Sequence, residues 1–391
     1  MRGREAGWPG LAGLQVLASW VLLLLLLLPA LTPAHAAWWF MSQLSASYTS
    51  TRVHCKNIPG LVRRQRLLCN RHPDAMMAVT EGAVQGVRHC QKQFQDARWN
   101  CSTIPRDASV FGRHVLRTGT RESAFVYSIN SAGVVHAVTR ACSRGAITNC
   151  ACDLTKKGTE TDWVGQFSWG GCSDNIRYGT AFARKFIDAR DRGQRDARAL
   201  MNLHNNRAGR KGVRKKMRLE CKCHGVSGSC TTRTCWQTMA PFGATARWLK
   251  ARYDEATEVS MLPNGDGLVP RLGEHRAPRK KDLVYLESSP DYCLADTSYG
   301  FTGTGGRQCN KTSRGPDGCE LLCCGRGYDT HRRLITSKCE CKFQWCCSVD
   351  CKTCESWRDL HFCKPRQEPS PSPSTSPLSS PPSLPSPASP L

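Results

Sequence analysis

The chain has 391 residues, of which 24 are cysteines, and its formal net charge is +24 at pH 7. Its hydrophobic fraction of 40% and charged fraction of 22% are ordinary for a globular protein. An even number of cysteines in a chain that enters an oxidising compartment indicates a disulfide framework, which argues against reactive thiols or zinc ligands. The positive charge predicts anionic surroundings, either sulfated glycosaminoglycan or an anionic membrane surface, unless it only forms a solvated face.

The N-terminus, 1–36, has the pattern of a signal peptide. Two arginines precede an apolar run from Leu11 to Leu31, and Ala34-His35-Ala36 is a small-x-small cleavage site. We therefore predict a protein that passes through the endoplasmic reticulum and is secreted to the extracellular space and matrix. The alternative is that the run stays in the bilayer as an anchor, because about 20 apolar residues suffice to span it.

A helical N-terminal domain is predicted over 37–257. The segment 122–142 is apolar on nearly every side, which is typical of a helix buried by its neighbours. Further helices are predicted over 176–191 and 196–206. The first of these two places three large apolar side chains on one face, where we expect them to be core: Phe182, Phe186 and Ile187.

Three changes of composition follow. The segment 258–282 is rich in glycine, proline and charge and is predicted to be a linker. The segment 283–363 contains twelve cysteines and should form a small cystine-rich domain of β-hairpins. The tail, 364–391, is rich in proline and serine and is predicted to be disordered. The expected fold class is therefore α+β and disulfide-rich.

Two kinds of surface site are predicted from short patterns. Asn100 and Asn310 head N-glycosylation sequons, although a bridge at Cys101 makes the first less accessible. Basic residues near position 213 are predicted to form a stripe that binds heparan sulfate: Arg210, Lys211, Arg214, Lys215 and Lys216.

The most informative stretch is 220–236, ECKCHGVSGSCTTRTCW. Nested bridges from Cys221 to Cys235 and from Cys223 to Cys230 would make a tight hairpin with Ser227 at its tip. Glycines at 225 and 228 leave little bulk over the serine hydroxyl.

Three interpretations of Ser227 compete. A hydrolase nucleophile needs G-x-S-x-G between a strand and a helix, and Ser229 stands where the second glycine should be. A zinc site from Cys221, Cys223, His224 and Cys230 has suitable residue types, but these cysteines would compete with oxidation. The third interpretation is a serine that only makes a turn.

The chain resembles the Wnt signalling proteins in a series of long motifs that run in order from Cys55 to Cys363. They include FQDARWNCST, SAGVVHAVTRACS, WGGCSDNIRYG, ECKCHGVSGSCTTRTCW, CELLCCGRGYDT and CKFQWCC. The resemblance implies a two-domain secreted ligand with no catalytic activity, no metal and no cofactor other than a covalent lipid. In that family the serine of CHGVSGSC, here Ser227, is esterified with palmitoleate by an acyltransferase of the endoplasmic reticulum.

The partners implied are those of the family: the Frizzled cysteine-rich domain, an LRP-type co-receptor, and a carrier during export, with no nucleic acid. The lipid would enter a groove of the Frizzled domain, while a C-terminal finger, Cys341 to Cys351, grips the other side. On this finger the resemblance gives receptor contact to Phe343, Trp345, Cys346 and Cys347.

The resemblance also implies a disulfide pairing. The implied bridges are Cys90–Cys101, Cys142–Cys150, Cys152–Cys172, Cys221–Cys235, Cys223–Cys230, Cys293–Cys324, Cys309–Cys319, Cys323–Cys363, Cys339–Cys354 and Cys341–Cys351, which leaves Cys55–Cys69 and the adjacent pair Cys346–Cys347. The last is the least expected, because adjacent Cα atoms about 3.8 Å apart are closer than the usual disulfide range.

Two features depart from the family pattern: Gln344 stands where histidine is more common, and the Pro/Ser tail has no counterpart. A rival from another class also remains, a heparan-sulfate-binding matrix protein without a receptor. Basic clusters and disulfides fit both classes, whereas only the ligand needs an acyl-acceptor loop and an aromatic finger.

Overall fold

The computed structural model describes residues 55, 58, 61–101, 118–156, 169–231, 233–271, 276–296 and 301–365. The predicted signal peptide and nearly all of the Pro/Ser tail lie outside these residues. In the part that is described, no helix is both long enough and apolar enough to cross a membrane. The chain forms two compact units, and the mixed helix and strand, disulfide-rich fold that the sequence predicts is confirmed.

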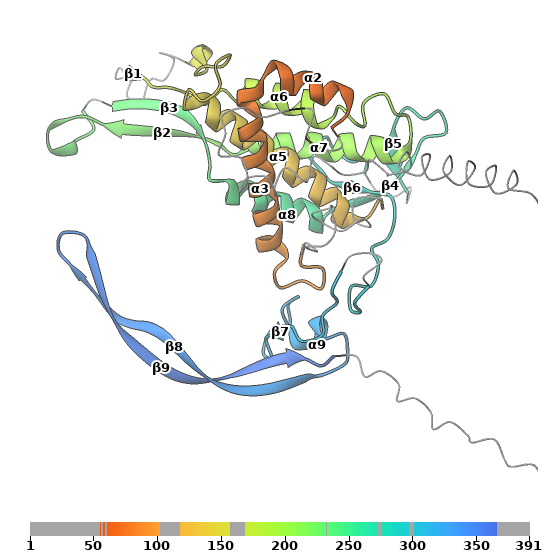
Figure 1. Ribbon diagram of the computed structural model, residues 1–391, viewed down its shortest axis with the longest axis vertical. Helices are drawn as coiled ribbons and strands as arrows, with labels where there is room; N and C mark the ends of the chain where they lie inside the picture. Colours follow the sequence, from red (N-terminus) through yellow and green to blue (C-terminus); the bar gives the residue numbers. More distant parts are fainter. Residues whose placement is uncertain are drawn as a thin grey trace, which may run out of the picture. The chain divides into compact units, whose positions relative to one another are not determined.

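Unit 1 holds six α-helices among its described residues: α2 (Arg63–Arg71), α3 (Pro73–Phe94), α5 (Arg121–Ser143), α6 (Ile176–Ile187), α7 (Ala197–Lys215) and α8 (Phe242–Asp254). Helix α5 lies at the centre and contacts α3, α6, α7 and α8 (Figure 1). Its apolar character on nearly every side is explained by this position, because neighbours bury 18 of its 23 residues. Phe182, Phe186 and Ile187 of α6 are buried, as their spacing indicates.

Close helix packing in unit 1 depends on glycines that face backbone. A Cβ at Gly133 of α5 would collide with the backbone oxygen of Gly82 on α3, and one at Gly209 of α7 would collide with the oxygen of Ser128 on α5. Helices α5, α6 and α7 each begin after a residue whose side chain accepts from a backbone amide, such as Asp196 at α7, whose carboxylate accepts from Ala199 N at 2.8 Å.

Two small sheets complete unit 1. The first has the strand order β1-β3-β2, with β1 (Trp169–Gly170), β2 (Met217–Cys223) and β3 (Arg233–Met239). The second has the order β5-β4-β6, with β4 (Thr257–Met261), β5 (Leu268–Pro270) and β6 (Val284–Tyr285).

The second sheet lies where the sequence predicts a linker, 258–282, and the start of the second domain. Strands β4 and β5 form within that segment, and unit 1 continues to Pro290. The side chain of Asn205 on α7 explains the difference. Its amide nitrogen donates to Val284 O at 2.9 Å and its amide oxygen accepts from Val284 N at 3.0 Å, which joins β6 to the helical unit.

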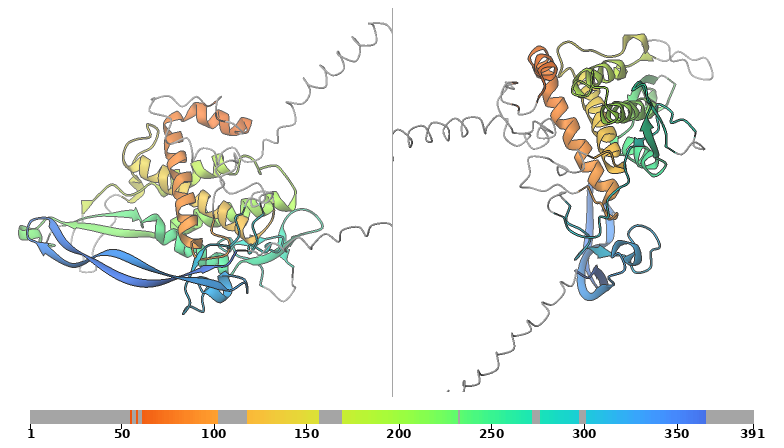
Figure 2. Two further views of the ribbon diagram at one scale, coloured as in Figure 1. Left: turned by 60° about the horizontal axis from the view of Figure 1, so that its bottom comes forward. Right: turned by 90° about the vertical axis from the view of Figure 1, so that its right-hand side faces the viewer.

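Unit 2 consists mainly of a long, twisted two-stranded ribbon, β8 (Tyr328–Gln344) with β9 (Ser348–Cys363) (Figure 2). A short strand, β7 (Gln308–Cys309), pairs with the end of β9, and a single turn of helix, α9 (Cys319–Leu322), packs beside it. The core is small and built largely from half-cystines: Cys309, Cys319, Leu322, Cys323 and Cys363.

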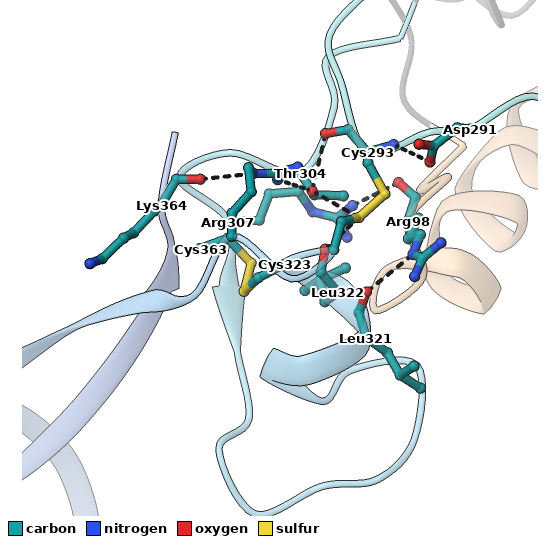
Figure 3. Close-up of a disulfide and its surroundings, with 12 residues drawn as sticks. Arg98, Asp291, Cys293, Thr304, Arg307, Leu321, Leu322, Cys323, Cys363 and Lys364 are labelled. Carbon is teal, nitrogen blue, oxygen red and sulfur yellow. Dashed lines mark hydrogen bonds between the residues drawn. A yellow bond between two sulfur atoms is a disulfide. The ribbon is translucent and has the colours of Figure 1, made fainter. Parts of the chain in front are cut away.

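Crosslinks therefore replace most of a hydrophobic core in unit 2. Figure 3 shows Cys323 bonded to Cys363 at the end of the ribbon, beside Cys293 and Thr304. The Thr304 hydroxyl donates to Cys293 O at 3.3 Å, and Cys293 is bonded to Cys324. A crosslinked hairpin is present here, as the sequence predicts for 283–363, but the predicted start is too early, because unit 1 continues to Pro290. The ribbon supplies little buried apolar surface.

All 24 cysteines are among the described residues, and 22 of them form eleven disulfides. The pairs are the eleven between non-adjacent cysteines that the resemblance implies. The twelfth differs, because Cys346 and Cys347 are free and their sulfurs lie 3.4 Å apart. Both residues are exposed in the turn that joins β8 to β9 and have positive φ, 73° and 95°.

Candidate functional site

The hairpin that carries Ser227 projects from the helices of unit 1 (Figure 1). Cys221 and Cys235 are direct partners in the register of β2 and β3 and are bonded to each other. A second bridge, Cys223 to Cys230, closes the loop beyond the strands. The two nested crosslinks hold the hairpin in shape although most of its residues are exposed.

A short turn of 3-10 helix, Val226–Gly228, forms the tip of this loop. Ser227 lies in the left-handed region, with φ 55° and ψ 26°, and is exposed, as is Val226 at 89%. Three backbone hydrogen bonds close the turn: Gly225 N to Ser229 O at 2.8 Å, Gly228 N to Gly225 O at 3.0 Å and Ser229 N to Val226 O at 3.1 Å.

The glycines of the loop have separate physical roles. A Cβ at Gly225 would collide with the hydroxyls of Ser229 and Thr231, so the loop closes this tightly only with glycine there. Gly228 has φ 78°, a conformation that L side chains rarely adopt. Together they allow the chain to reverse direction around Ser227.

The two serines of the loop differ in what surrounds their hydroxyls. Ser229 Oγ lies 3.3 Å from Thr231 Oγ1, within hydrogen-bonding distance. The hydroxyl of Ser227 makes no hydrogen bond to any described residue, and it stands at the tip of the loop. Of the two serine hydroxyls, that of Ser227 is therefore the less encumbered.

Neither chemical rival for this loop is supported by the geometry. Within the described residues, no imidazole or carboxylate is hydrogen-bonded to Ser227, and His224 instead contacts Thr234 Oγ1 at 2.8 Å, so the pairing that activates a nucleophile is missing. The zinc alternative is wrong, because Cys221, Cys223 and Cys230 are all disulfide-bonded.

At its base the hairpin meets the buried face of unit 1. The ring of His136 on α5 packs against Phe242, the first residue of α8, with ring centroids 5.3 Å apart. Burial lowers the pKa of His136 to about 4. The ring is therefore neutral at physiological pH and packs as part of the buried interior of unit 1.

The second cluster of predicted site residues lies at the far end of the ribbon in unit 2. Phe343 is 71% exposed and Trp345 is 93% exposed. Gln344 and Ser348 are paired at the ends of the strands, so Trp345 and the two free cysteines form the turn itself. Two large aromatic side chains thus stand in solvent at the tip of a crosslinked hairpin, with Cys341–Cys351 just below them.

Only part of the predicted basic stripe is available on the surface. Lys211, Arg214 and Lys215 are exposed and Lys216 is half-buried. The inclusion of Arg210 is wrong: its guanidinium is buried and donates to both carboxylate oxygens of Asp188, at 2.8 and 2.9 Å. A buried guanidinium paired in this way is not free to bind a sulfate.

Arg207 is an exposed basic residue of this surface that is not among the five predicted from the sequence. It is one helical turn before Lys211 and two before Arg214, so the three share one face of α7. Arg207, Lys211 and Arg214 are four and three residues apart in the sequence, the spacing of one helix face, and this pattern favours Arg207 over Arg210. The basic surface is hereafter the α7 stripe: Arg207, Lys211, Arg214 and Lys215.

The second sequon lies in an exposed loop closed by the bridge Cys309–Cys319. The Asn310 amide oxygen accepts from the Thr312 amide at 3.1 Å and from its hydroxyl at 3.0 Å, while both residues are exposed. A hydrogen bond from the Ser313 hydroxyl lowers the pKa of the neighbouring Asp317. Asn100 is half-buried, and Ser102 of its sequon lies outside the described residues.

We expect the secreted protein to carry a glycan at Asn310. Asn310→Gln and Thr312→Ala should each increase its mobility on a denaturing gel by one glycan, because both destroy the sequon. Thr312→Ser keeps the sequon and should leave mobility as in the wild type. Unchanged mobility of Asn310→Gln would show that the site is unoccupied.

Comparison with known proteins gives consistent matches. The model of the Wnt family matches residues 57–364. Protein Wnt-2b-A of Xenopus laevis is 54% identical over 346 residues, which cover 88% of this chain and 96% of that protein. A chain of the complex of human WLS with WNT8A is similar in structure, with a TM-score of 0.55 and 39% identity, covering 74% of this chain and 93% of that chain.

Proposed function

The chain belongs to the Wnt family, and we propose that it is a secreted ligand, palmitoleoylated at Ser227, that binds the Frizzled cysteine-rich domain. The acyl chain enters a groove of that domain, and the finger with Phe343 and Trp345 contacts its other side. An LRP-type co-receptor completes the signalling complex. The signal peptide pattern of 1–36 supports secretion into the extracellular space and matrix.

The observation that carries this proposal is the exposed, left-handed Ser227 at the tip of a loop closed by two disulfides. An acyltransferase of the endoplasmic reticulum has to bring its own backbone close to the acceptor hydroxyl. The glycines at 225 and 228 leave room for this approach, and the hydroxyl makes no hydrogen bond to a described residue that would have to be broken.

The energetics favour a lipid as the main receptor contact. At about 0.8 kcal/mol for each buried methylene, the roughly twelve methylenes of a monounsaturated sixteen-carbon chain contribute up to roughly ten kcal/mol before ordering costs. One chain gives only marginal membrane affinity, so a carrier has to shield it during export. The matched complex contains WLS, and we propose a protein of that type as the carrier here.

One measurement tests the acylation directly. The peptide that spans Cys223 to Cys230 is isolated from active secreted protein and its intact mass is determined. We expect the mass of a monounsaturated sixteen-carbon ester on the peptide. A peptide without an acyl adduct would contradict the proposal and leave the matrix protein as the leading candidate.

The α7 stripe favours an additional role that the rival class would share, which is retention on heparan sulfate. Its four cationic side chains, Arg207, Lys211, Arg214 and Lys215, are exposed along one helix, and the chain as a whole has a formal charge of +24. Binding to a polyanion through released counterions weakens steeply with salt. We therefore propose that the stripe holds the ligand on the extracellular matrix.

We expect replacement of the four stripe residues by glutamine to lower the salt concentration at which the protein elutes from heparin. The matched control replaces four exposed arginines of α2 by glutamine: Arg63, Arg64, Arg66 and Arg71. It removes the same charge and should have a smaller effect. Equal effects of the two variants would mean that net charge alone accounts for retention.

A further inference from the structure

A segment before α6 lies along the outer edge of the acyl hairpin, defined here as residues 217–239. Strand β1 is parallel to β3, and beyond it Gly171 N donates to Cys235 O at 2.8 Å. Asp174 N then donates to Gln237 O at 2.8 Å, and Gln237 N donates to Ser173 Oγ at 3.0 Å. The segment thus follows β3 to its end.

The side chain of Asp174 makes a connection of a different kind. One carboxylate oxygen accepts from Met239 N at 2.8 Å and from Thr238 Oγ1 at 2.9 Å, both at the base of β3. The other accepts from the hydroxyl of Ser143, the last residue of α5. Ionised carboxylates only accept, and their two oxygens provide about four acceptor sites, so this one group joins three donors from two elements.

The segment that holds Asp174 is itself fixed. Cys172 is bonded to Cys152, and Asp153 N donates to Ser173 O at 2.9 Å. Asn175 is the N-cap of α6, and its side chain accepts from Tyr178 N at 3.0 Å. Asp174 is therefore placed by neighbours on both sides in addition to the backbone hydrogen bonds that its segment makes with β3.

The hairpin, in contrast, keeps its own shape through the bridges Cys221–Cys235 and Cys223–Cys230. Beyond its base most of its residues are exposed or half-buried. Contacts at the base thus have little influence on the loop around Ser227, and they control instead how the hairpin is directed from the helices.

We propose that Asp174 is a positioning residue that directs the acyl hairpin by tying β3 to the end of α5. This inference rests on the proposed function, because the direction of the hairpin matters only if its tip binds. The acyl loop belongs to unit 1 and the finger to unit 2. Two linked contacts with one receptor domain reinforce each other only when both can form at once, and a hairpin held in one direction relative to the helices of unit 1 loses less conformational freedom when it binds.

The test compares Asp174→Ala with Asp174→Asn in the secreted full chain. Alanine removes all three acceptor contacts. Asparagine has the same shape, and its amide oxygen accepts from Met239 N and Thr238 Oγ1 while its amide nitrogen donates to Ser143 Oγ. We expect Asp174→Ala to bind the Frizzled cysteine-rich domain about tenfold more weakly and Asp174→Asn to stay within about threefold of wild type.

A double-mutant cycle with Trp345→Ala separates positioning from simple destabilisation. Once the finger contact is lost, the direction of the hairpin no longer decides whether two contacts form together. The effect of Asp174→Ala should then fall to about twofold or less. An equal loss in both backgrounds, wild-type binding by Asp174→Ala, or failure of asparagine to restore binding would each overturn the inference.

Two further readouts distinguish failure of this inference from failure of the proposed function. The acyl mass on the Cys223 to Cys230 peptide should be the same in wild type, Asp174→Ala and Asp174→Asn. If the wild type has no acyl group, the proposed function fails, and hydrogen exchange alone decides the inference. The backbone amide of Met239 should exchange its hydrogen with solvent faster in Asp174→Ala than in the wild type, and at the wild-type rate in Asp174→Asn. Unchanged exchange in Asp174→Ala would overturn the inference.

Discussion

Ser227→Ala is expected to abolish the acyl adduct and to weaken binding to the Frizzled cysteine-rich domain by about 100-fold or more. The reason is the size of the lipid contribution, up to roughly ten kcal/mol, which no side chain replaces. The product should be more soluble in water and inactive in signalling, or be retained in the cell. Mass analysis, receptor titration, and comparison of medium with cell lysate measure these outcomes.

Ser229→Ala is the matched control, since it removes a hydroxyl from the same loop. That hydroxyl lies beside Thr231 and is not at the tip, so the variant should keep the acyl mass. Ser227→Gly supplies a second test, because glycine adopts the φ of 55° at this position without the cost that an L side chain has. An acyl group on Ser227→Ala would contradict Ser227 as the acceptor, and its absence from Ser229→Ala in the same experiment would identify Ser229.

Trp345→Ala is expected to be secreted normally, to keep the acyl group, and to lose about 2 kcal/mol or more of receptor binding free energy, roughly 30-fold in affinity. Trp345 is 93% exposed in the turn of the ribbon, so its removal leaves no cavity in the fold. Titration against the isolated Frizzled domain measures the loss, and Phe343→Ala should act in the same direction.

The ribbon provides its own control in Trp357, which is 61% exposed and lies opposite Leu334, away from the tip. Trp357→Ala removes the same chemical group from the same two strands and should change receptor affinity by no more than about threefold. Reduced secretion of Trp345→Ala would favour a packing role for the tryptophan, and an equal loss in both variants would mean that the whole ribbon is the contact surface.

Much of the architecture follows from local patterns in the sequence. The apolar residues around the whole of 122–142 predict the buried helix that the structure shows as α5, Arg121–Ser143. The cysteine and glycine spacing around Ser227 predicts a closed loop, because bridges seven and fourteen residues apart leave the short chain few alternatives. These features depend on neighbours in the sequence and are therefore visible in it.

Features that depend on distant residues were not predictable in this way. Arg210 resembles its basic neighbours in the sequence. In the structure, however, its guanidinium is buried in unit 1 and donates to the carboxylate of Asp188, 22 residues earlier. The segment 258–282 has the composition of a linker, yet β4 and β6 form a parallel pair and Asn205 of α7 binds Val284. In both cases the deciding hydrogen bonds join parts of the chain that only folding brings together.

The contacts of Asp174 show the same division. Nothing in the residues around position 174 indicates that its carboxylate meets Thr238 and Met239, more than sixty residues later, together with Ser143. By itself, the sequence determined the family, the crosslinked hairpins and the serine at the loop tip. The tertiary structure decided which charges are buried and how the acyl hairpin is held, because burial and hydrogen bonding at these positions depend on which distant elements pack against them.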